Sequence, residues 1–382
     1  MREEKVLVIG GGGFYGRYLV ADLVQHTNAE IVVASRHPPA TWDGLDRVRS
    51  KVCDLRDLAT LERLANDCRL VIHCAGPFQQ LLLNPLHAAI HTKSDYIDIA
   101  EDRNYAKQVQ ALTEEIRRAG ITVLSGLSVA PAMEALFAEM LRSCFDTLIS
   151  VRTFAAPDTR KHRGMAMFHT MLTGVGKPFW QPGNGKLRRV RGWTEPEWVE
   201  FPPPLGKRLT YLVLEMADLD LLPELFGVKT VEFKAGTEWQ LLNRLLNMAA
   251  HIRRVTGYPN WENFTSLIRA FSWLVGRFGK DEGGVIFEIR GFRNGTLTTH
   301  RIAVTARRDG GLIPSILAGI AAWKLFSGQL TQKGLVPVHQ WITSEELVAA
   351  LKTRGLEIWW QPPEASAWQA FDFSDYRTYQ KN

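Results

Sequence analysis

The stretch that decides the fold is Lys5-Val6-Leu7-Val8-Ile9-Gly10-Gly11-Gly12-Gly13-Phe14-Tyr15-Gly16. A mainly apolar run, typical of a buried parallel strand, leads directly into glycines at positions 11, 13 and 16, which fit the pattern G-x-G-x-x-G. The next residues repeat their apolar positions at helical spacing. A strand, a glycine-rich turn and a helix in this order predict a dinucleotide-binding domain.

Each glycine of this turn has a physical reason. The first allows the tight turn, the second lets the backbone approach a pyrophosphate, and the third lets the helix pack on the strand. The start of the helix supplies amide donors and the positive end of the helix dipole. We therefore expect the pyrophosphate to bind at five residues: Gly11, Gly13, Phe14, Tyr15 and Gly16.

The first 125 residues continue the alternation of short β-branched runs and helix-period segments. Further strands are expected at residues 31–35, 48–54, 70–76 and 121–126. This βαβ rhythm is typical of a parallel sheet covered on both faces. The sequence thus predicts an α/β fold whose N-terminal domain, residues 1–127, is a doubly wound parallel sheet of the Rossmann type.

From Ala130 the rhythm changes, and two further parts are expected. Residues 128–310 are predicted to form an α+β domain for substrate binding or dimerisation, with loops rich in Gly, Pro and Trp from about Gly174 to Pro204. Its strands are expected at 150–156, 230–236, 284–292 and 299–308, and its helices at 131–141, 241–255 and 264–278. Residues 311–382 are expected to be a C-terminal helical segment that packs back on the other domains.

Composition and charge exclude several classes of protein. Lys and Arg exceed Asp and Glu by only 46 − 40 = 6, spread along the chain, so no nucleic-acid partner is expected. Four cysteines without paired spacing lie in apolar segments, as in reduced cytoplasmic proteins. The longest apolar run, residues 310–326, is broken by Pro314 and contains Lys324, so no membrane span is expected.

The end of the second predicted strand bears on which dinucleotide binds. An NAD enzyme is expected to place an acid there for the ribose 2′-OH, yet this strand ends in Ser35-Arg36-His37. Arg36 can make a bidentate contact with a 2′-phosphate and stack on the adenine, and Ser35 can donate a hydrogen bond. The sequence therefore predicts NADP rather than NAD. The alternative is that Arg36 is an ordinary surface residue.

The ends of the third and fourth strands complete the predicted cofactor site. Asp54, followed by Leu55, is placed to accept from the adenine amino group, and Asp57 is placed to cap the helix that starts at Leu58. After the fourth strand, small residues let the backbone run close to the nicotinamide ribose, and a proline rigidifies the turn. The residues expected there are Ala75, Gly76, Pro77 and Phe78.

Taken together, these motifs resemble those of the saccharopine dehydrogenase-like NADP-dependent oxidoreductases. The resemblance rests on the glycine-rich loop, the Ser-Arg strand end, the CAGPF turn at 74–78 and DYIDIAED at 95–102. It continues less specifically through residues 125–136, 163–164, 174–179, 230–236 and 310–319. It is closest to bacterial members of unassigned substrate. One departure is Ala100 before Glu101, where better-known members have glycine.

Candidates for chemistry cluster after the fifth strand, at Tyr96, Asp98 and Glu101. Tyr96 and Asp98 share one face of an alternating strand, and the carboxyl end of that strand delivers Asp98 and Glu101 toward the binding crevice. A carboxylate there can orient an amine substrate or act as a general base. The alternative is that Asp98 or Asp102 caps the helix that starts near Asn104.

Basic residues of the second domain, above all Arg163 and Lys177, are candidates for binding a substrate carboxylate. The alternative is that they are solvated loop charges. His87 and His91 lie four residues apart but lack an intervening Glu and a third ligand, so no metal is expected.

The leading functional hypothesis is an NADP-dependent oxidoreductase that acts on a small amino-acid-like, imine or carbonyl substrate between two domains. A non-catalytic NADP-binding redox sensor or scaffold is one alternative. A reductase of a lipid or polyketide is another, favoured by the aromatic residues Trp180, Trp193 and Trp198. No Tyr-x-x-x-Lys and no G-x-S-x-G occurs, which argues against classical short-chain dehydrogenases and hydrolases. The apolar C-terminal helix and the tryptophans would suit a homodimer.

Overall fold

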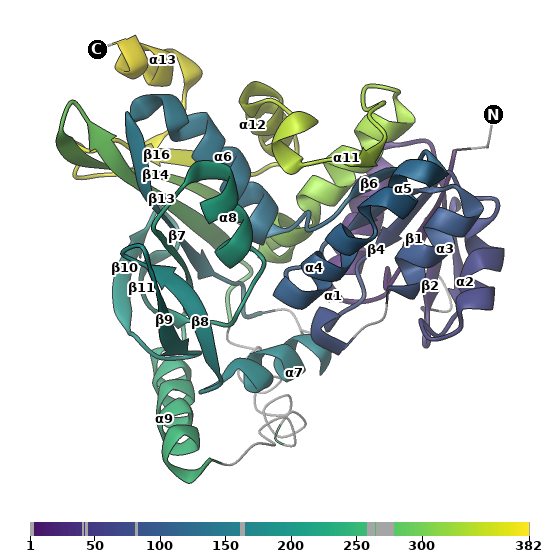
Figure 1. The fold of residues 1–382 in the computed structure, drawn as a ribbon, viewed down its shortest axis with the longest axis horizontal. Helices are drawn as coiled ribbons and strands as arrows, with labels where there is room; N and C mark the ends of the chain where they lie inside the picture. Colours follow the sequence, from purple (N-terminus) through teal and green to yellow (C-terminus); the bar gives the residue numbers. More distant parts are fainter. Residues whose placement is uncertain are drawn as a thin grey trace. The chain divides into compact units, whose positions relative to one another are not determined.

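The structure is a computed structural model and describes residues 4–39, 42, 45–80, 83–160, 165–257, 264 and 279–381. The chain forms two compact units (Figure 1). Unit 1 comprises Met1–Met133 and Pro314–Ile342, and unit 2 comprises Glu134–Ile313 and Thr343–Asn382. The chain therefore leaves unit 1 to build most of unit 2, returns to unit 1 for Pro314–Ile342, and leaves again to end in unit 2.

Unit 1 is built on a parallel sheet in which the seven strands have the order β15-β6-β5-β4-β1-β2-β3. Every pairing within it is parallel, and β1 pairs with β2 on one side and β4 on the other. The strand order reverses beside β1, which is the position where doubly wound sheets bind ligands. The predicted Rossmann fold is confirmed. The strands are β1 (Lys5–Ile9), β2 (Glu30–Ser35), β3 (Val48–Val52), β4 (Leu70–His73), β5 (Asp95–Asp98), β6 (Thr122–Leu124) and β15 (Gly334–Leu335).

The central strands of unit 1 are covered on both faces, since Leu7 and Val8 of β1 and Val71 and Ile72 of β4 are fully buried. Burial on both sides explains why these strands read as continuous apolar runs rather than alternating ones. One covering helix comes from the returning segment and packs against α1. The helices are α1 (Phe14–His26), α2 (Leu58–Ala65), α3 (Asn84–Thr92), α4 (Arg103–Ala111), α5 (Thr113–Ala119) and α11 (Ile316–Phe326).

Unit 2 contains an eight-stranded mixed sheet of order β10-β11-β12-β7-β13-β14-β16-β17. Helices α6 and α8 lie against one face of it (Figure 1), and Phe154, Ile286 and Ala303 belong to a buried apolar cluster. Its strands are β7 (Thr147–Ala156), β10 (Glu197–Phe201), β11 (Gly206–Leu212), β12 (Thr230–Ala235), β13 (Gly283–Arg293), β14 (Thr296–Ala306), β16 (Glu357–Gln361) and β17 (Gln369–Ala370). Its helices are α6 (Glu134–Leu141), α7 (Met165–Gly174), α8 (Asp218–Phe226), α9 (Gln240–Thr256), α12 (Ser344–Thr353) and α13 (Phe373–Lys381).

The prediction that the region from Gly174 to Pro204 consists of loops is wrong, because the region contains strands. β8 (Pro178–Gly183) and β9 (Lys186–Arg191) form an antiparallel hairpin, and β10 follows. Asn184 and Gly185 at the turn both have positive φ, the backbone of a two-residue hairpin turn that the dipeptide Asn-Gly favours. That dipeptide was the signal available in the sequence.

Two other expectations concern helices in the second half of the chain. The predicted helix at 264–278 lies outside the described residues except for Phe264. The C-terminal part, predicted to be helical, has the expected helices α11 and α12 but also β15, β16 and β17. These strands are too short or too rich in Trp and Gln to show a clear period-two pattern.

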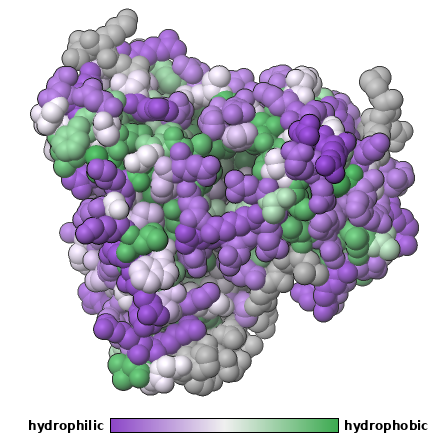
Figure 2. All heavy atoms as spheres, in the orientation of Figure 1, coloured by the Kyte–Doolittle hydropathy of each residue, from purple (hydrophilic) through white to green (hydrophobic). Residues whose placement is uncertain are grey.

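Hydrophilic residues cover most of the face drawn in Figure 2, with hydrophobic ones scattered among them. Among the described residues, none of the helices combines the length and apolar character that a membrane crossing requires. All four cysteines are buried, and none of them forms a disulfide in the structure.

Candidate dinucleotide-binding site

The glycine-rich turn after β1 is closed by its own backbone. The amide of Gly13 donates to the carbonyl of Gly10 at 2.8 Å. A Cβ on Gly16 would lie 2.2 Å from that same carbonyl oxygen, so only glycine allows α1 to approach the turn this closely. Gly10 has φ +82°, and a Cβ there would lie 2.6 Å from the backbone of Ala75. Sequence reasoning missed Gly10, although the run of four glycines contained it.

The N-terminus of α1 is open to an anion. Gly13 is its N-cap, no side chain caps it, and its first turn holds no acidic residue. The first amides of any α-helix have no acceptor within the helix, and the helix dipole favours negative charge there. Gly13 is also exposed to solvent. These features fit the pyrophosphate of a dinucleotide.

The end of β2 carries hydrogen-bond donors and no acidic side chain. The Ser35 hydroxyl oxygen is buried and has no hydrogen-bond partner among the described residues. Arg36, the next residue, is exposed, and its positive charge helps to lower the pKa of Asp54. A buried hydroxyl without a partner costs free energy unless a ligand satisfies it. The pair therefore fits a phosphorylated ribose.

The turn after β3 is held by its own charges. Asp54 accepts from the Arg56 side chain at 2.8 and 3.2 Å and from the Arg56 amide at 3.0 Å. These hydrogen bonds lower the pKa of Asp54 to about 2. Asp57 caps α2 by accepting from the amide of Thr60 at 3.0 Å, which confirms the predicted cap. The Leu55 carbonyl accepts from Asn84 at 3.0 Å.

The segment after β4 packs tightly on the glycine-rich turn through Ala75 and Gly10. Phe78 is nearly buried, and its ring meets those of His73 and Tyr105 edge-on, with centroids 4.9 and 5.1 Å away. His73 is fully buried, and neither ring nitrogen has a partner among the described residues. Burial lowers the pKa of His73 to about 3, so the ring is neutral at physiological pH.

Asp98 at the end of β5 is a fully buried carboxylate that the protein itself satisfies. It accepts from the amides of Ala100 at 3.0 Å and Gly126 at 2.8 Å, and from the Ser125 hydroxyl at 2.8 Å. Burial raises the pKa of Asp98 to about 6, and these hydrogen bonds oppose the rise. Asp98 thereby ties the end of β5 to the loop that follows β6.

Tyr96 is also fully buried, and its hydroxyl lies 2.9 Å from that of Tyr105. Burial is the largest cause that raises the pKa of both phenols well above the usual value. Two neutral hydroxyls that pair inside the domain are well suited to fix α4 against β5.

Glu101 differs from the acids on either side of it. Asp102 caps α4 by accepting from the Tyr105 amide at 2.8 Å, which confirms the capping alternative for Asp102. Glu101 is partly exposed and makes no hydrogen bond with the described residues. Burial of its carboxyl group, and then the charge of Asp102, raise the pKa of Glu101 to about 7. A carboxyl group in this state can give or take a proton near neutral pH.

Of the two predicted substrate-binding residues, the structure describes Lys177, in unit 2. Lys177 is exposed, in the turn between α7 and β8, and its amide donates to Gly174 at 3.0 Å. Arg163 lies outside the described residues.

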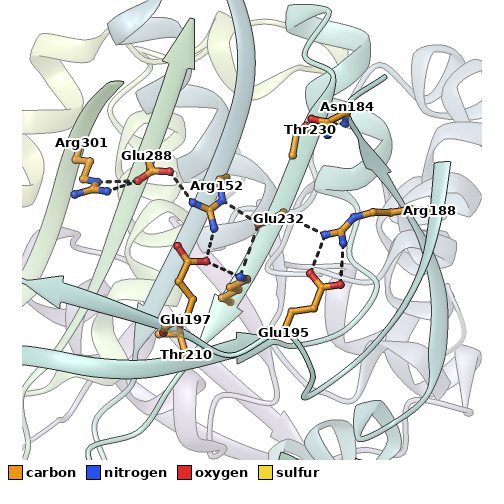
Figure 3. A network of polar contacts seen from close by, with 11 residues as sticks. Arg152, Asn184, Arg188, Glu195, Glu197, Thr210, Thr230, Glu232, Glu288 and Arg301 are labelled. Atoms are coloured by element: carbon orange, nitrogen blue, oxygen red, sulfur yellow. Dashed lines mark hydrogen bonds and ion pairs between the residues drawn. The ribbon is translucent and has the colours of Figure 1, made fainter. Parts of the chain in front are cut away.

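A network of ion pairs on the sheet of unit 2 was not visible in the sequence (Figure 3). Arg152 donates to Glu232 and Glu288, each at 2.9 Å, and to Glu197. Burial alone would lower the pKa of Arg152, but the three glutamates raise it overall. Further ion pairs join Arg301 to Glu288, Lys234 to Glu197, and Arg188 to Glu195 and Glu232.

A polar cavity of about 310 Å³ borders this network and is lined in part by Arg152, Glu288, Arg290 and Arg301. Of these, Arg152 and Arg301 already form ion pairs with Glu288. Glu232 and Glu288 lie on β12 and β13, the strands on either side of β7, and are 80 and 136 residues from Arg152 in the sequence, so spacing gave no sign of these contacts. We read the network as structural.

The class of protein follows from unit 1: a parallel doubly wound sheet with a glycine-rich turn at its switch point is a dinucleotide-binding domain. Residues 6–124 match the family model of the saccharopine dehydrogenase NADP-binding domain. This match confirms the resemblance over that part of the chain and NADP as the cofactor.

Solved structures share the fold over nearly the whole chain. Apo saccharopine dehydrogenase (L-Glu forming) from Saccharomyces cerevisiae has a TM-score of 0.65 at 15% identity, covering 94% of this chain and 99% of that one. Homospermidine synthase from Legionella pneumophila in complex with NAD has a TM-score of 0.58 at 11% identity, covering 92% and 89%. A search of curated protein sequences finds no match. The fold is thus that of a saccharopine dehydrogenase-like protein.

Proposed function

We propose that the protein is an NADP-dependent oxidoreductase that transfers hydride to or from a small amino-acid-like, imine or carbonyl substrate. The observation that carries the proposal is the end of β2, where the buried, unpartnered Ser35 hydroxyl and the exposed Arg36 stand in place of an acid. The family match and the dehydrogenase among the structural neighbours support it.

Selection of NADP over NAD is assigned to Arg36 and Ser35. A guanidinium presents parallel N–H donors that match a phosphate group, and the Ser35 hydroxyl adds a donor. The turn at Gly11, Gly13 and Gly16, with Phe14 and Tyr15, holds the pyrophosphate at the start of α1. Asp54 and Leu55 border the adenine. The segment Ala75–Phe78 borders the nicotinamide ribose.

Proton transfer is assigned to Glu101. NADP, when bound, supplies or accepts the hydride, so the protein has to handle one proton. With a pKa of about 7, Glu101 is present in both protonation states at neutral pH. In oxidation Glu101 accepts the proton that the substrate amine or hydroxyl loses. In reduction it returns that proton.

Asp98 and Tyr96 are assigned positioning roles in this scheme. Both side chains are fully buried and hydrogen-bonded within unit 1, so neither offers an unoccupied group to a substrate. They hold the end of β5, the segment from which Glu101 extends. Arg163 and Lys177 stay predictions for binding a substrate carboxylate.

A non-catalytic NADP-binding protein is the second candidate. The observation that favours it is that two of the three predicted catalytic side chains, Tyr96 and Asp98, serve the structure itself. Such a protein would bind NADPH and turn over nothing.

The test is a screen of amino acids, imines, oxo acids and aldehydes, followed by NADPH absorbance in both directions. We expect turnover that Glu101→Gln reduces and that Glu114→Gln, an exposed control on α5, leaves intact. Turnover that Glu101→Gln leaves unchanged would refute the role of Glu101. Tight NADPH binding without turnover on any class would favour the second candidate.

A further inference from the structure

Helix α9 of unit 2 has two apolar faces, and the described residues bury one of them. Leu246 and Ala250 are buried in a cluster with Val175, Trp193 and Tyr211. The other face is open to solvent although its side chains are large and apolar. Their exposed fractions are 71% for Leu241, 41% for Leu245, 53% for Met248, 45% for Ile252 and 86% for Val255.

The exposed side chains form one continuous stripe. Their spacing alternates four, three, four and three residues, which keeps them on one side of a helix with 3.6 residues per turn. Over 17 residues the helix is about 25 Å long. Single exposed apolar residues are ordinary, but an aligned group of this extent marks a surface for binding. We call these five residues the α9 stripe.

The charged side chains on α9 itself are all basic. Arg244, His251 and Arg254 are exposed, and α9 contains no acidic residue. On the helix, Arg244 and His251 border one edge of the stripe, and Arg254 lies further round on the same side. An apolar stripe on a helix whose charges are all basic is typical of a helix that lies on an anionic membrane surface.

The stripe is held in place before any partner arrives. Asn247 donates to the Trp193 carbonyl at 2.7 Å, and Arg253 donates to the Val175 carbonyl at 2.6 Å. These bonds fix α9 at both ends of the β8–β9 hairpin, because Val175 precedes β8 and Trp193 follows β9. Binding therefore need not order the helix, which removes an entropic cost that a disordered segment would carry.

We propose that α9 docks the protein on anionic lipid bilayers, with the α9 stripe inserted at the level of the outer acyl chains and the arginines against lipid phosphates. Two copies of α9 packed stripe to stripe would bring together two helices whose charges are all basic, which opposes self-pairing. An anionic surface matches the basic charge of α9. The proposal is independent of the proposed oxidoreductase activity.

The test is flotation of the full chain with vesicles of phosphatidylglycerol and phosphatidylcholine, compared with phosphatidylcholine alone. We expect binding to the anionic vesicles that weakens as salt is raised. The double substitution Leu245→Asn and Ile252→Asn is expected to weaken it by about tenfold or more, because each removes apolar area from the membrane. Leu297→Asn, at a leucine that is 47% exposed on β14 of the same unit, is the matched control and should bind like the wild type.

A second pair of substitutions separates charge from apolar contact. Arg244→Gln with Arg254→Gln should weaken binding to the anionic vesicles and change nothing on phosphatidylcholine alone. Circular dichroism and NADPH binding verify that each variant is folded.

Three results would overturn the proposal. The first is a wild-type chain that does not float with anionic vesicles. The second is a dimer in analytical ultracentrifugation that the double substitution dissociates, with no effect on vesicles, since the partner is then a second copy. The third is a double variant whose unfolding temperature falls while vesicle binding is unchanged, since the stripe is then covered by the protein's own chain.

Discussion

At the scale of single residues, the acids after β5 show how neighbouring carboxylates acquire different roles. Asp98 is satisfied by two amides and a hydroxyl, Asp102 caps a helix, and Glu101 lies between them without a hydrogen bond to the described residues. The sequence identified Tyr96, Asp98 and Glu101 together as catalytic candidates. It could not rank them, because the hydrogen bonds that satisfy Asp98 come partly from the loop after β6, from residues 27 and 28 positions further along.

The pH dependence of turnover tests the role of Glu101. The pKa of Glu101 is raised to about 7, so the carboxylate that oxidation needs is lost below pH 7 and the acid that reduction needs is lost above it. We therefore expect kcat/KM for oxidation to rise with pH through about 7, and for reduction to fall. Glu101→Gln should lower kcat by about 10²- to 10⁴-fold and abolish this inflection. An unchanged inflection in the variant would assign it to another group.

At the scale of elements, the turn between β1 and α1 contains two kinds of glycine. Gly16 is required by the fold itself, whereas Gly13 is required for ligand binding. A Cβ on Gly16 would meet backbone atoms at 2.2 and 2.6 Å, whereas one on Gly13 would meet a single carbonyl oxygen at 3.1 Å. Gly13 also has φ −74°, which any residue adopts. The absence of a side chain at Gly13 therefore matters for a ligand that approaches the N-terminus of α1.

Alanine substitutions should reveal this difference. Gly13→Ala is expected to leave the unfolding temperature nearly unchanged and to weaken NADPH binding by about tenfold or more, a loss of about 1.4 kcal/mol. Gly16→Ala should lower the unfolding temperature because backbone has to shift. The measurements are calorimetric unfolding and NADPH titration. Equal effects of both substitutions on both quantities would contradict the account.

The ion-pair network of unit 2 makes a second prediction at this scale. Arg152→Met leaves three glutamates close together without their shared cation, and removing one partner of a buried pair costs about 3–5 kcal/mol. Arg117→Met, which breaks an exposed pair with Glu114, should cost much less, because solvent screens that pair. Denaturant unfolding of both variants provides the comparison. A cost for Arg152→Met as small as that for Arg117→Met would show that the network contributes little.

At the scale of the whole molecule, what could be predicted depended on how local the signal was. The parallel sheet around β1 follows from βαβ units, each encoded in about 30 adjacent residues, and it was anticipated. Residues 311–382 were expected to pack back on the other domains, but the sequence did not indicate that Pro314–Ile342 joins unit 1 and the rest unit 2. That division depends on contacts such as that of Arg69 with the carbonyls of Leu325 and Phe326. Helix α11 is apolar on nearly every side, and such a helix gives no sign of which surface will cover it.

The central claim is that the end of β2 selects NADP, and the most direct measurement is a titration of the protein with NADPH and NADH, repeated for Arg36→Ala. We expect NADPH to bind more tightly than NADH in the wild type. Arg36→Ala should weaken NADPH binding about 10- to 100-fold, because a charge-assisted bidentate contact is lost, and should leave NADH binding unchanged. Equal affinity for the two cofactors, with no effect of Arg36→Ala on NADPH, would contradict the account.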